Sequence, residues 1–144
     1  MSSSSTLGIR LTAVAGAMAA AAAVFLIARY AIGLRLHTTG FTPSQQPADL
    51  NIGIVLAASA VGSALGIGAL ALIQRTARRP RRTWVITAAI VLLASLSAPF
   101  AGHGITIGNE LALACMHLAV GAVLIPALAA TAHPMSVLRY KVAA

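Results

Sequence analysis

Arg75-Thr76-Ala77-Arg78-Arg79-Pro80-Arg81-Arg82 is the stretch that decides how this chain folds. It holds five of the ten Lys and Arg residues of the sequence and lies near its middle. Long apolar segments almost free of charge flank it on both sides. Because basic residues gather on the cytoplasmic side of membrane proteins, we interpret the stretch as a cytoplasmic turn between two transmembrane hairpins. The residues predicted to set the topology and to contact anionic lipid are Arg75, Arg78, Arg79, Arg81 and Arg82.

The composition is typical of an integral membrane protein. Hydrophobic residues make up 59% of the 144 residues and charged residues only 8%, whereas a soluble domain carries about 25% charged residues. A water-soluble chain this short could not cover so much apolar surface. The net charge of +8 would suggest nucleic acid in a soluble protein, but the arginine stretch lacks interleaved aromatic residues. We therefore expect the lipid bilayer, and no nucleic acid, as a partner.

Four apolar spans are predicted outward from the turn, at about residues 11–34, 52–73, 84–101 and 111–132. They define an all-α fold, an integral membrane four-helix bundle over residues 10–133. The Ser-rich residues 1–9 are expected to be a disordered tail, and residues 134–144 a cytoplasmic tail. The first span also has features of a cleaved signal peptide, but its most apolar part follows the alanine run, where a cleavage site should lie.

The charge count predicts that both termini lie in the cytoplasm. With that topology, eight of the ten basic residues are cytoplasmic, which is a strong positive-inside bias for a plasma-membrane protein. Arg29 and Arg35 are the exceptions, and we expect them to pair with Asp49 and Glu110, the two acidic residues, at the external end. Asp49 comes just before the second span, where it is also expected either to cap the helix or to interact with the positive end of the helix dipole.

The second span contains a GxxxG pattern, Gly62-Ser63-Ala64-Leu65-Gly66. Ala58, Gly62, Gly66 and Ala69 share one helical face. Small residues let helix backbones approach closely inside a membrane, so Gly62 and Gly66 are predicted helix-packing residues. The pattern leaves open whether the packing partner is another helix of this chain or a second subunit. Trp84 begins the third span and is expected at the membrane interface.

Two ionisable residues of the fourth span are candidates for function. Glu110 and His117 share a helical face with i, i+7 spacing. Such a pair could relay a proton or hold a ligand. The structural alternative is that Glu110 lies at the interface and that neighbouring hydroxyls or carbonyls satisfy His117.

Other catalytic signals are weak. Cys115 is the single cysteine, which excludes a disulfide within the chain, and we expect it to be a small buried core residue. The four histidines show no HxxxH spacing, so no metal site is predicted, although His37, His103 and Glu110 could meet externally. Nucleotide-binding and hydrolase motifs are absent from the sequence. We therefore expect no cofactor and no enzyme activity.

Three segments carry a resemblance to a known family. They are Arg81-Arg82-Thr83-Trp84, Ser95-Leu96-Ser97-Ala98-Pro99 and Met116-His117-Leu118-Ala119-Val120-Gly121-Ala122-Val123-Leu124-Ile125-Pro126. From about Arg10 to Thr131 the chain resembles a family of small four-span actinobacterial membrane proteins catalogued as a domain of unknown function. The resemblance implies a four-helix membrane bundle and no particular activity.

The sequence thus predicts a small multi-pass membrane protein that acts by helix packing, with itself as a homo-oligomer or with a membrane partner. The alternative prediction is a small transporter or permease component that uses Glu110 and His117. A substrate cannot be read from the residues.

Overall fold

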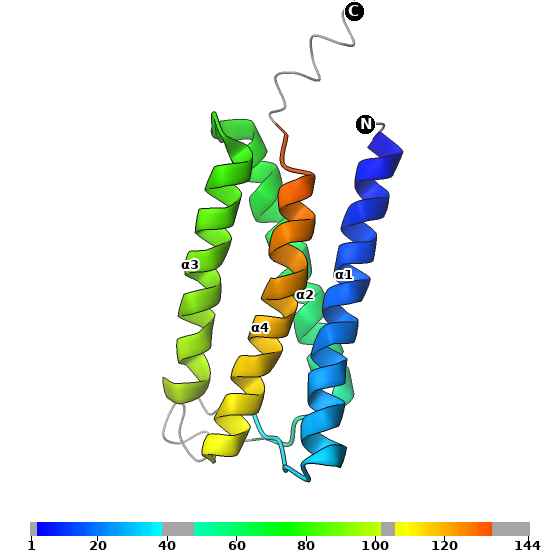
Figure 1. Ribbon diagram of the computed structural model, residues 1–144, viewed down its shortest axis with the longest axis vertical. Coiled ribbons are helices and arrows are strands. Elements are labelled where there is room, and N and C mark those ends of the chain that lie inside the picture. The colour runs from blue at the N-terminus through cyan, green and yellow to red at the C-terminus, as the bar shows by residue number, and fades with distance from the viewer. Residues whose placement is uncertain (1–2, 39–47, 102–105, 134–144) are drawn as a thin grey trace, which may run out of the picture.

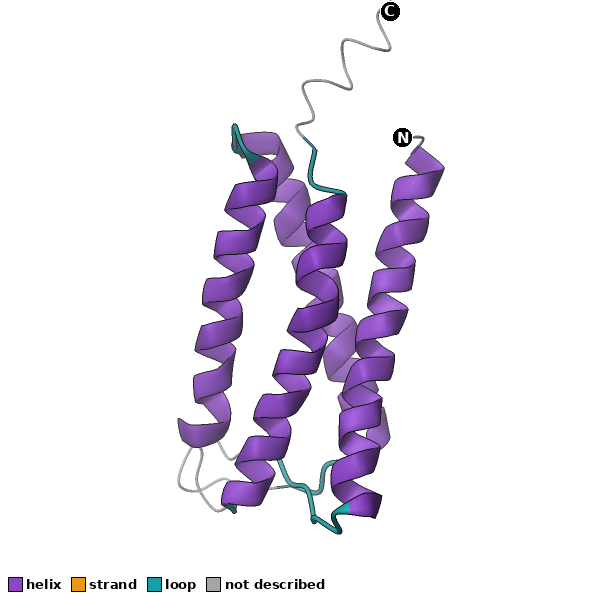
Figure 2. Cartoon of the chain, in the orientation of Figure 1, coloured by secondary structure: helices purple, strands orange, loops and turns teal. Residues whose placement is uncertain are grey.

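The computed structural model describes residues 3–38, 48–101 and 106–133. Four α-helices run antiparallel to their chain neighbours and form an up-and-down bundle (Figure 1). They are α1 (Ser3–Leu26), which continues into a π-helical turn η1 (Ile27–Ala31), α2 (Ile52–Thr76), α3 (Pro80–Ala101) and α4 (Ile107–Ala130). Figure 2 shows that helices make up nearly all of the described chain. The predicted all-α four-helix fold is confirmed.

The helix ends differ from the predicted spans, and the starts of α1 and α3 are two examples. α1 begins at Ser3, so the structure differs from the predicted disorder over residues 3–9; extending a helix that already exists costs far less than nucleating one. α3 begins at Pro80, because proline is well suited to the first helical position, where its missing N–H needs no partner. Arg81 and Arg82 therefore belong to the first turn of α3. The predicted tail at 134–144 lies outside the described residues.

α1 ends where the chain needs a positive φ angle. The N–H of Ile32 donates to Ile27 O at 3.0 Å and that of Leu34 donates to Ala28 O at 2.9 Å. Gly33 lies between them with φ 79°, a conformation that glycine adopts without steric cost. The turn sends the chain back under the bundle, where Leu36 is buried.

α4 is the helix that holds the bundle together. It packs along α1 on one side and along α3 on the other (Figure 1). α2 packs on α1 near its beginning and on α3 and α4 near its end, as the two apolar clusters that contain Val55 and Leu70 show. Ala13, Ala17 and Ala21 form the buried stripe of α1 at i, i+4 and i+8, so the alanine-rich sequence lets the α1 backbone approach α4 closely.

Large apolar side chains cover the outside of the bundle. Leu65 on α2 and Leu93 on α3 are 69% and 68% exposed. A bundle in water could not leave so many leucines unburied, whereas lipid solvates them. All four helices are long and apolar enough to cross a membrane. The protein is therefore a multi-pass membrane protein.

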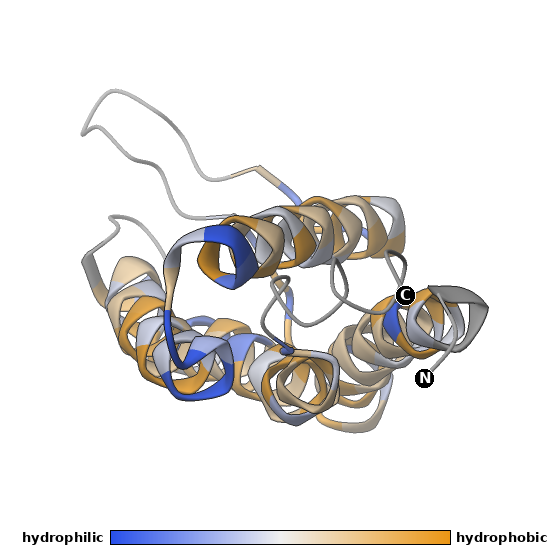
Figure 3. Ribbon diagram, turned by 90° about the horizontal axis from the view of Figure 1, so that it is seen from above, coloured by the Kyte–Doolittle hydropathy of each residue, from blue (hydrophilic) through white to orange (hydrophobic). Residues whose placement is uncertain are grey.

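The two ends of the bundle differ in charge. We call one the arginine end: it contains Arg10 and the α2–α3 turn, which Figure 3 shows as strongly hydrophilic. The start of α1 and the end of α4 lie there too (Figure 1). The other, which we call the acidic end, contains Asp49 and Glu110, the two acidic residues of the chain. Glu110 lies in the first turn of α4 and Asp49 just before α2, so both acidic groups lie at one end of the bundle.

Candidate functional site

Asn109 organises the acidic end. This residue of the first turn of α4 is only 1% exposed. Its Oδ1 accepts a hydrogen bond from the backbone N–H of His37 at 2.6 Å, and its Nδ2 donates to His37 O at 3.0 Å. The amide therefore satisfies both backbone groups of a residue 72 positions away. It attaches the segment after α1 to the start of α4.

His37 is also the partner of Asp49. Its Nε2 lies 3.0 Å from Asp49 Oδ1, and the two residues form an isolated antiparallel bridge. The bridge closes the base of the connection between α1 and α2. The prediction that Asp49 caps α2 is wrong, because the Asn51 side chain accepts the hydrogen bond from Ile54 N instead.

The expected external ion pairs do not form. Within residues 3–38, 48–101 and 106–133 the one acid–base contact is that of His37 with Asp49. Arg29 and Arg35 are both exposed and pair with neither acid in this part of the chain. The carboxylate of Asp49 lies instead beside the ring of His37.

Glu110 and His117 are not brought together. His117 Nδ1 lies 2.8 Å from Leu113 O, so its ring bonds to its own helix. Seven residues of helix separate the two side chains by about 10 Å along the axis. No hydrogen bond or ion pair joins them in the described part of the chain, nor does one hold the Glu110 carboxyl group there. The pair thus shares a face without forming a site.

The two glycines of the GxxxG pattern face different surroundings. A Cβ added to Gly66 would lie 3.6 Å from Trp84 and 3.8 Å from Leu128, so this glycine packs inside the bundle. A Cβ added to Gly62 would meet nothing within 4 Å. The inward face of α2 instead carries Val55, Ser59, Ser63 and Leu70. The predicted common face is therefore split between the interior and the exterior.

Trp84 is more buried than expected, and Cys115 is less buried than expected. Trp84 is only 5% exposed, and its Nε1 donates to Ile125 O at 3.1 Å. It therefore packs in the core at the arginine end instead of lying outward at the membrane interface. Cys115 is exposed because it lies on the outward face of α4, which lipid covers.

A polar network that the sequence analysis missed joins three helices at the arginine end. Arg10 donates to Gln74 Oε1 at 3.1 Å and to Thr131 Oγ1 at 3.3 Å. Gln74 Nε2 donates to Thr131 O at 2.9 Å and to His133 O at 3.2 Å. The network satisfies carbonyls beyond the last turn of α4. The sequence signal for this network was Gln74, the polar residue that directly follows the predicted second span.

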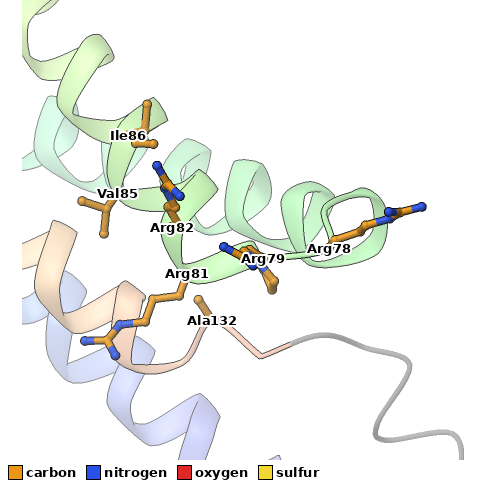
Figure 4. Close-up of a pocket in the computed structure, with 8 residues that line it drawn as sticks. Arg78, Arg79, Arg81, Arg82, Val85, Ile86 and Ala132 are labelled. Carbon is orange, nitrogen blue, oxygen red and sulfur yellow. The ribbon is translucent and has the colours of Figure 1, made fainter.

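Four arginines line a hollow at the same end (Figure 4). They are Arg78, Arg79, Arg81 and Arg82, and Val85, Ile86 and Ala132 supply apolar lining. Arg75, the fifth arginine of the stretch, does not line it. All four lining guanidinium groups belong to exposed residues, and no ion pair forms on them within the described residues.

The metal prediction stays a prediction. The described residues contain no group of three His, Cys, Asp or Glu side chains that could hold a metal ion. His103, one of the three residues that could have met externally, lies outside them.

These features define a four-span membrane protein whose apolar helices join two polar ends. The chain belongs to the family of unknown function DUF6069, whose model matches residues 2–134. The predicted resemblance to a family of unknown function is thus confirmed. No curated protein and no solved structure matches the chain.

Proposed function

We propose that this protein is a non-enzymatic plasma-membrane protein that acts by packing α2 against a transmembrane helix of a second copy or of a membrane partner. The observation that carries the proposal is the open surface at Gly62. Ala58, Leu65 and Ala69 are exposed on the same side of the helix. This outward face, which we call the Gly62 face, is shallow enough for close backbone approach.

At two other glycines, close contacts within the chain explain why no side chain is present. A Cβ on Gly16 would lie 3.3 Å from Val123, and one on Gly121 would lie 2.8 Å from Leu92. A glycine in a helix interior costs about 1 kcal/mol relative to alanine. Gly62 and Gly68 both have that cost without an internal contact that requires it, and of the two Gly62 lies on the face that also carries Ala58, Leu65 and Ala69. A helix packed on the Gly62 face would supply the missing reason, because small residues mark helix interfaces in membranes.

The charge distribution supports a cytoplasmic arginine end. Arg10 and the five arginines of the stretch lie there, against Arg29 and Arg35 at the acidic end. That asymmetry follows the positive-inside rule for short loops.

Transport through Glu110 and His117 has less support from the geometry. A proton relay needs groups that exchange protons with each other or through water. His117 is bonded to Leu113 O, and no contact between it and Glu110 appears in the described residues.

The test measures self-association in liposomes. Because Cys115, the single cysteine, faces lipid, it is replaced by Ser, and Ala48→Cys, at an exposed position outside the helices, carries donor or acceptor dyes for energy transfer between copies. We expect wild-type copies to associate and Gly62→Ile to weaken association about tenfold or more, since a large side chain separates the backbones. Gly68→Ile is the matched control, because Gly68 is also open but lies on another side of α2. Equal association of both variants would overturn packing through the Gly62 face.

A further inference from the structure

The arginine hollow combines charge and apolar surface at one point of the bundle. Arg79 and Arg81 lie on either side of Ala132 in the view of Figure 4, and Arg82 lies beside Ile86. Val85 and Ile86 are 40% and 49% exposed and begin the outward apolar face of α3. The lining thus changes from guanidinium groups to aliphatic side chains within about two helical turns.

No Asp or Glu side chain lies near this charge. The two acidic residues, Asp49 and Glu110, both belong to the opposite end. Arg10 differs from the four lining arginines, because Gln74 and Thr131 accept its hydrogen bonds. The four side chains extend in different directions from one short turn (Figure 4), and the repulsion between like charges gathered there falls when an anion binds beside them. The countercharge for the hollow must therefore come from outside the chain's own Asp and Glu side chains.

We propose that the hollow binds the phosphate headgroup of an anionic phospholipid, with an acyl chain lying along Val85 and Ile86. Guanidinium groups bind phosphate oxygens through paired charge-assisted hydrogen bonds. Basic pockets beside transmembrane helices are suited to such headgroups. This binding site is independent of the Gly62 face, which lies on another helix.

The apolar lining selects lipid over the other phosphate sources. Free phosphate would use the arginines but not Val85 and Ile86. A single-stranded nucleic acid would stack its bases on exposed aromatic rings, and Trp84, the aromatic residue next to the hollow, is buried and bonded to Ile125 O; any nucleic acid would leave Val85 and Ile86 unused. A two-part ligand, anionic and aliphatic, fits both parts of the lining.

Trp84 provides the measurement. It is the only tryptophan of the chain and directly precedes Val85. Quenching of its fluorescence by brominated phosphatidylglycerol and by brominated phosphatidylcholine, in the detergent-solubilised full chain, gives the relative affinity for the two lipids. We expect phosphatidylglycerol to bind about tenfold or more tightly, because each arginine near anionic lipid contributes a several-fold preference.

Matched variants assign the preference to the hollow. Arg79→Gln/Arg81→Gln should lose the preference about tenfold, whereas Arg29→Gln/Arg35→Gln, which removes the same charge at the acidic end, should keep it. Replacing Arg79 and Arg81 by Lys preserves charge and topology but removes bidentate contacts, so an intermediate loss is expected. The Lys variant carries the test if the Gln variant fails to fold.

Three results would overturn the proposal. Equal loss in the hollow and control variants would mean diffuse attraction by net charge. Full competition by millimolar inorganic phosphate would make the ligand a free anion. Displacement of phosphatidylglycerol by a short single-stranded oligonucleotide at lower concentration would assign the arginines to nucleic acid.

Discussion

The side-chain amide of Asn109 pairs with both backbone groups of His37, accepting from its N–H at 2.6 Å and donating to its carbonyl at 3.0 Å. The amide makes the two hydrogen bonds that a neighbouring strand would make to the His37 backbone. It fixes the chain that leaves α1 against the start of α4, at a place where the backbone is not helical and needs partners. His37 in turn lies beside Asp49, so one buried residue supports both described ends of the α1–α2 connection.

Replacing Asn109 should therefore loosen the acidic end. Asn109→Ala removes the partners of two backbone groups, so we expect the free energy of unfolding to fall by about 1–3 kcal/mol. Asn109→Asp keeps the acceptor but places a buried carboxylate oxygen against His37 O, so a loss at least as large is expected. Unfolding titrations with sodium dodecyl sulfate in mixed micelles would measure both. Wild-type stability of Asn109→Ala would show that the connection is held by other contacts.

Close packing of α3 on α4 gives the second prediction. A Cβ on Gly121 would lie 2.8 Å from Leu92 Cδ2, so Gly121→Ala forces Leu92 to move and should cost about 1–3 kcal/mol. Adding Leu92→Ala makes room, so the double variant should lose less than the sum of the two single changes. Gly68→Ala is the control: nothing lies within 4 Å of its added Cβ, and alanine should stabilise the helix by up to about 1 kcal/mol. Additive losses would mean that Leu92 does not limit the approach of α3.

The polar network at the arginine end gives the third prediction. Gln74→Leu removes the acceptor of Arg10 and the donor to Thr131 O and His133 O. Because Thr131 is buried, its carbonyl would lose a partner that water cannot easily replace, at a cost of about 1–3 kcal/mol. Arg75→Gln, one residue further along, changes an exposed side chain and should stay within about 0.5 kcal/mol of wild type. Thermal unfolding in detergent compares the two, and equal stability would assign the network no structural role.

The sequence was sufficient to predict the four-helix architecture but not which face of each helix turns inward. The arginine stretch and the apolar spans predicted the turn and the four helices, since the bilayer imposes length and composition on any helix that crosses it. Which face of α2 turns inward could not be predicted in the same way. In lipid both faces are apolar, so the pattern that marks the core of a soluble helix is absent. Gly62 and Gly66 were therefore assigned one face although only Gly66 packs inside the bundle.

The missed polar contacts have a different cause. Asn109 and His37 are 72 residues apart, and Arg10 and Thr131 are 121 residues apart. No local spacing rule links such positions, because their proximity follows from the antiparallel order of four helices of matched length. Asp49, in contrast, lies close enough to the start of α2 for an N-cap to be expected. The N-cap is Asn51, two residues later. Trp84 was expected at the interface because of its residue type. Its indole instead lies inside the bundle, where it donates to the carbonyl of Ile125.

His117 provides the last prediction, and it separates helix packing from transport. The carbonyl of Leu113 that accepts from His117 Nδ1 also lies in position to accept the helical N–H of the same residue. His117→Leu therefore removes one hydrogen bond without leaving that carbonyl unpaired, and an apolar side chain suits a lipid environment. We expect unfolding free energy within about 1 kcal/mol of wild type and unchanged energy transfer between labelled copies. Glu110→Gln should behave likewise, since no ion pair of Glu110 is found among the described residues. Proton flux into liposomes, followed with an internal pH dye, is the decisive measurement: a flux present in wild type and lost in either variant, with the fold intact, would replace packing by transport as the function of the bundle.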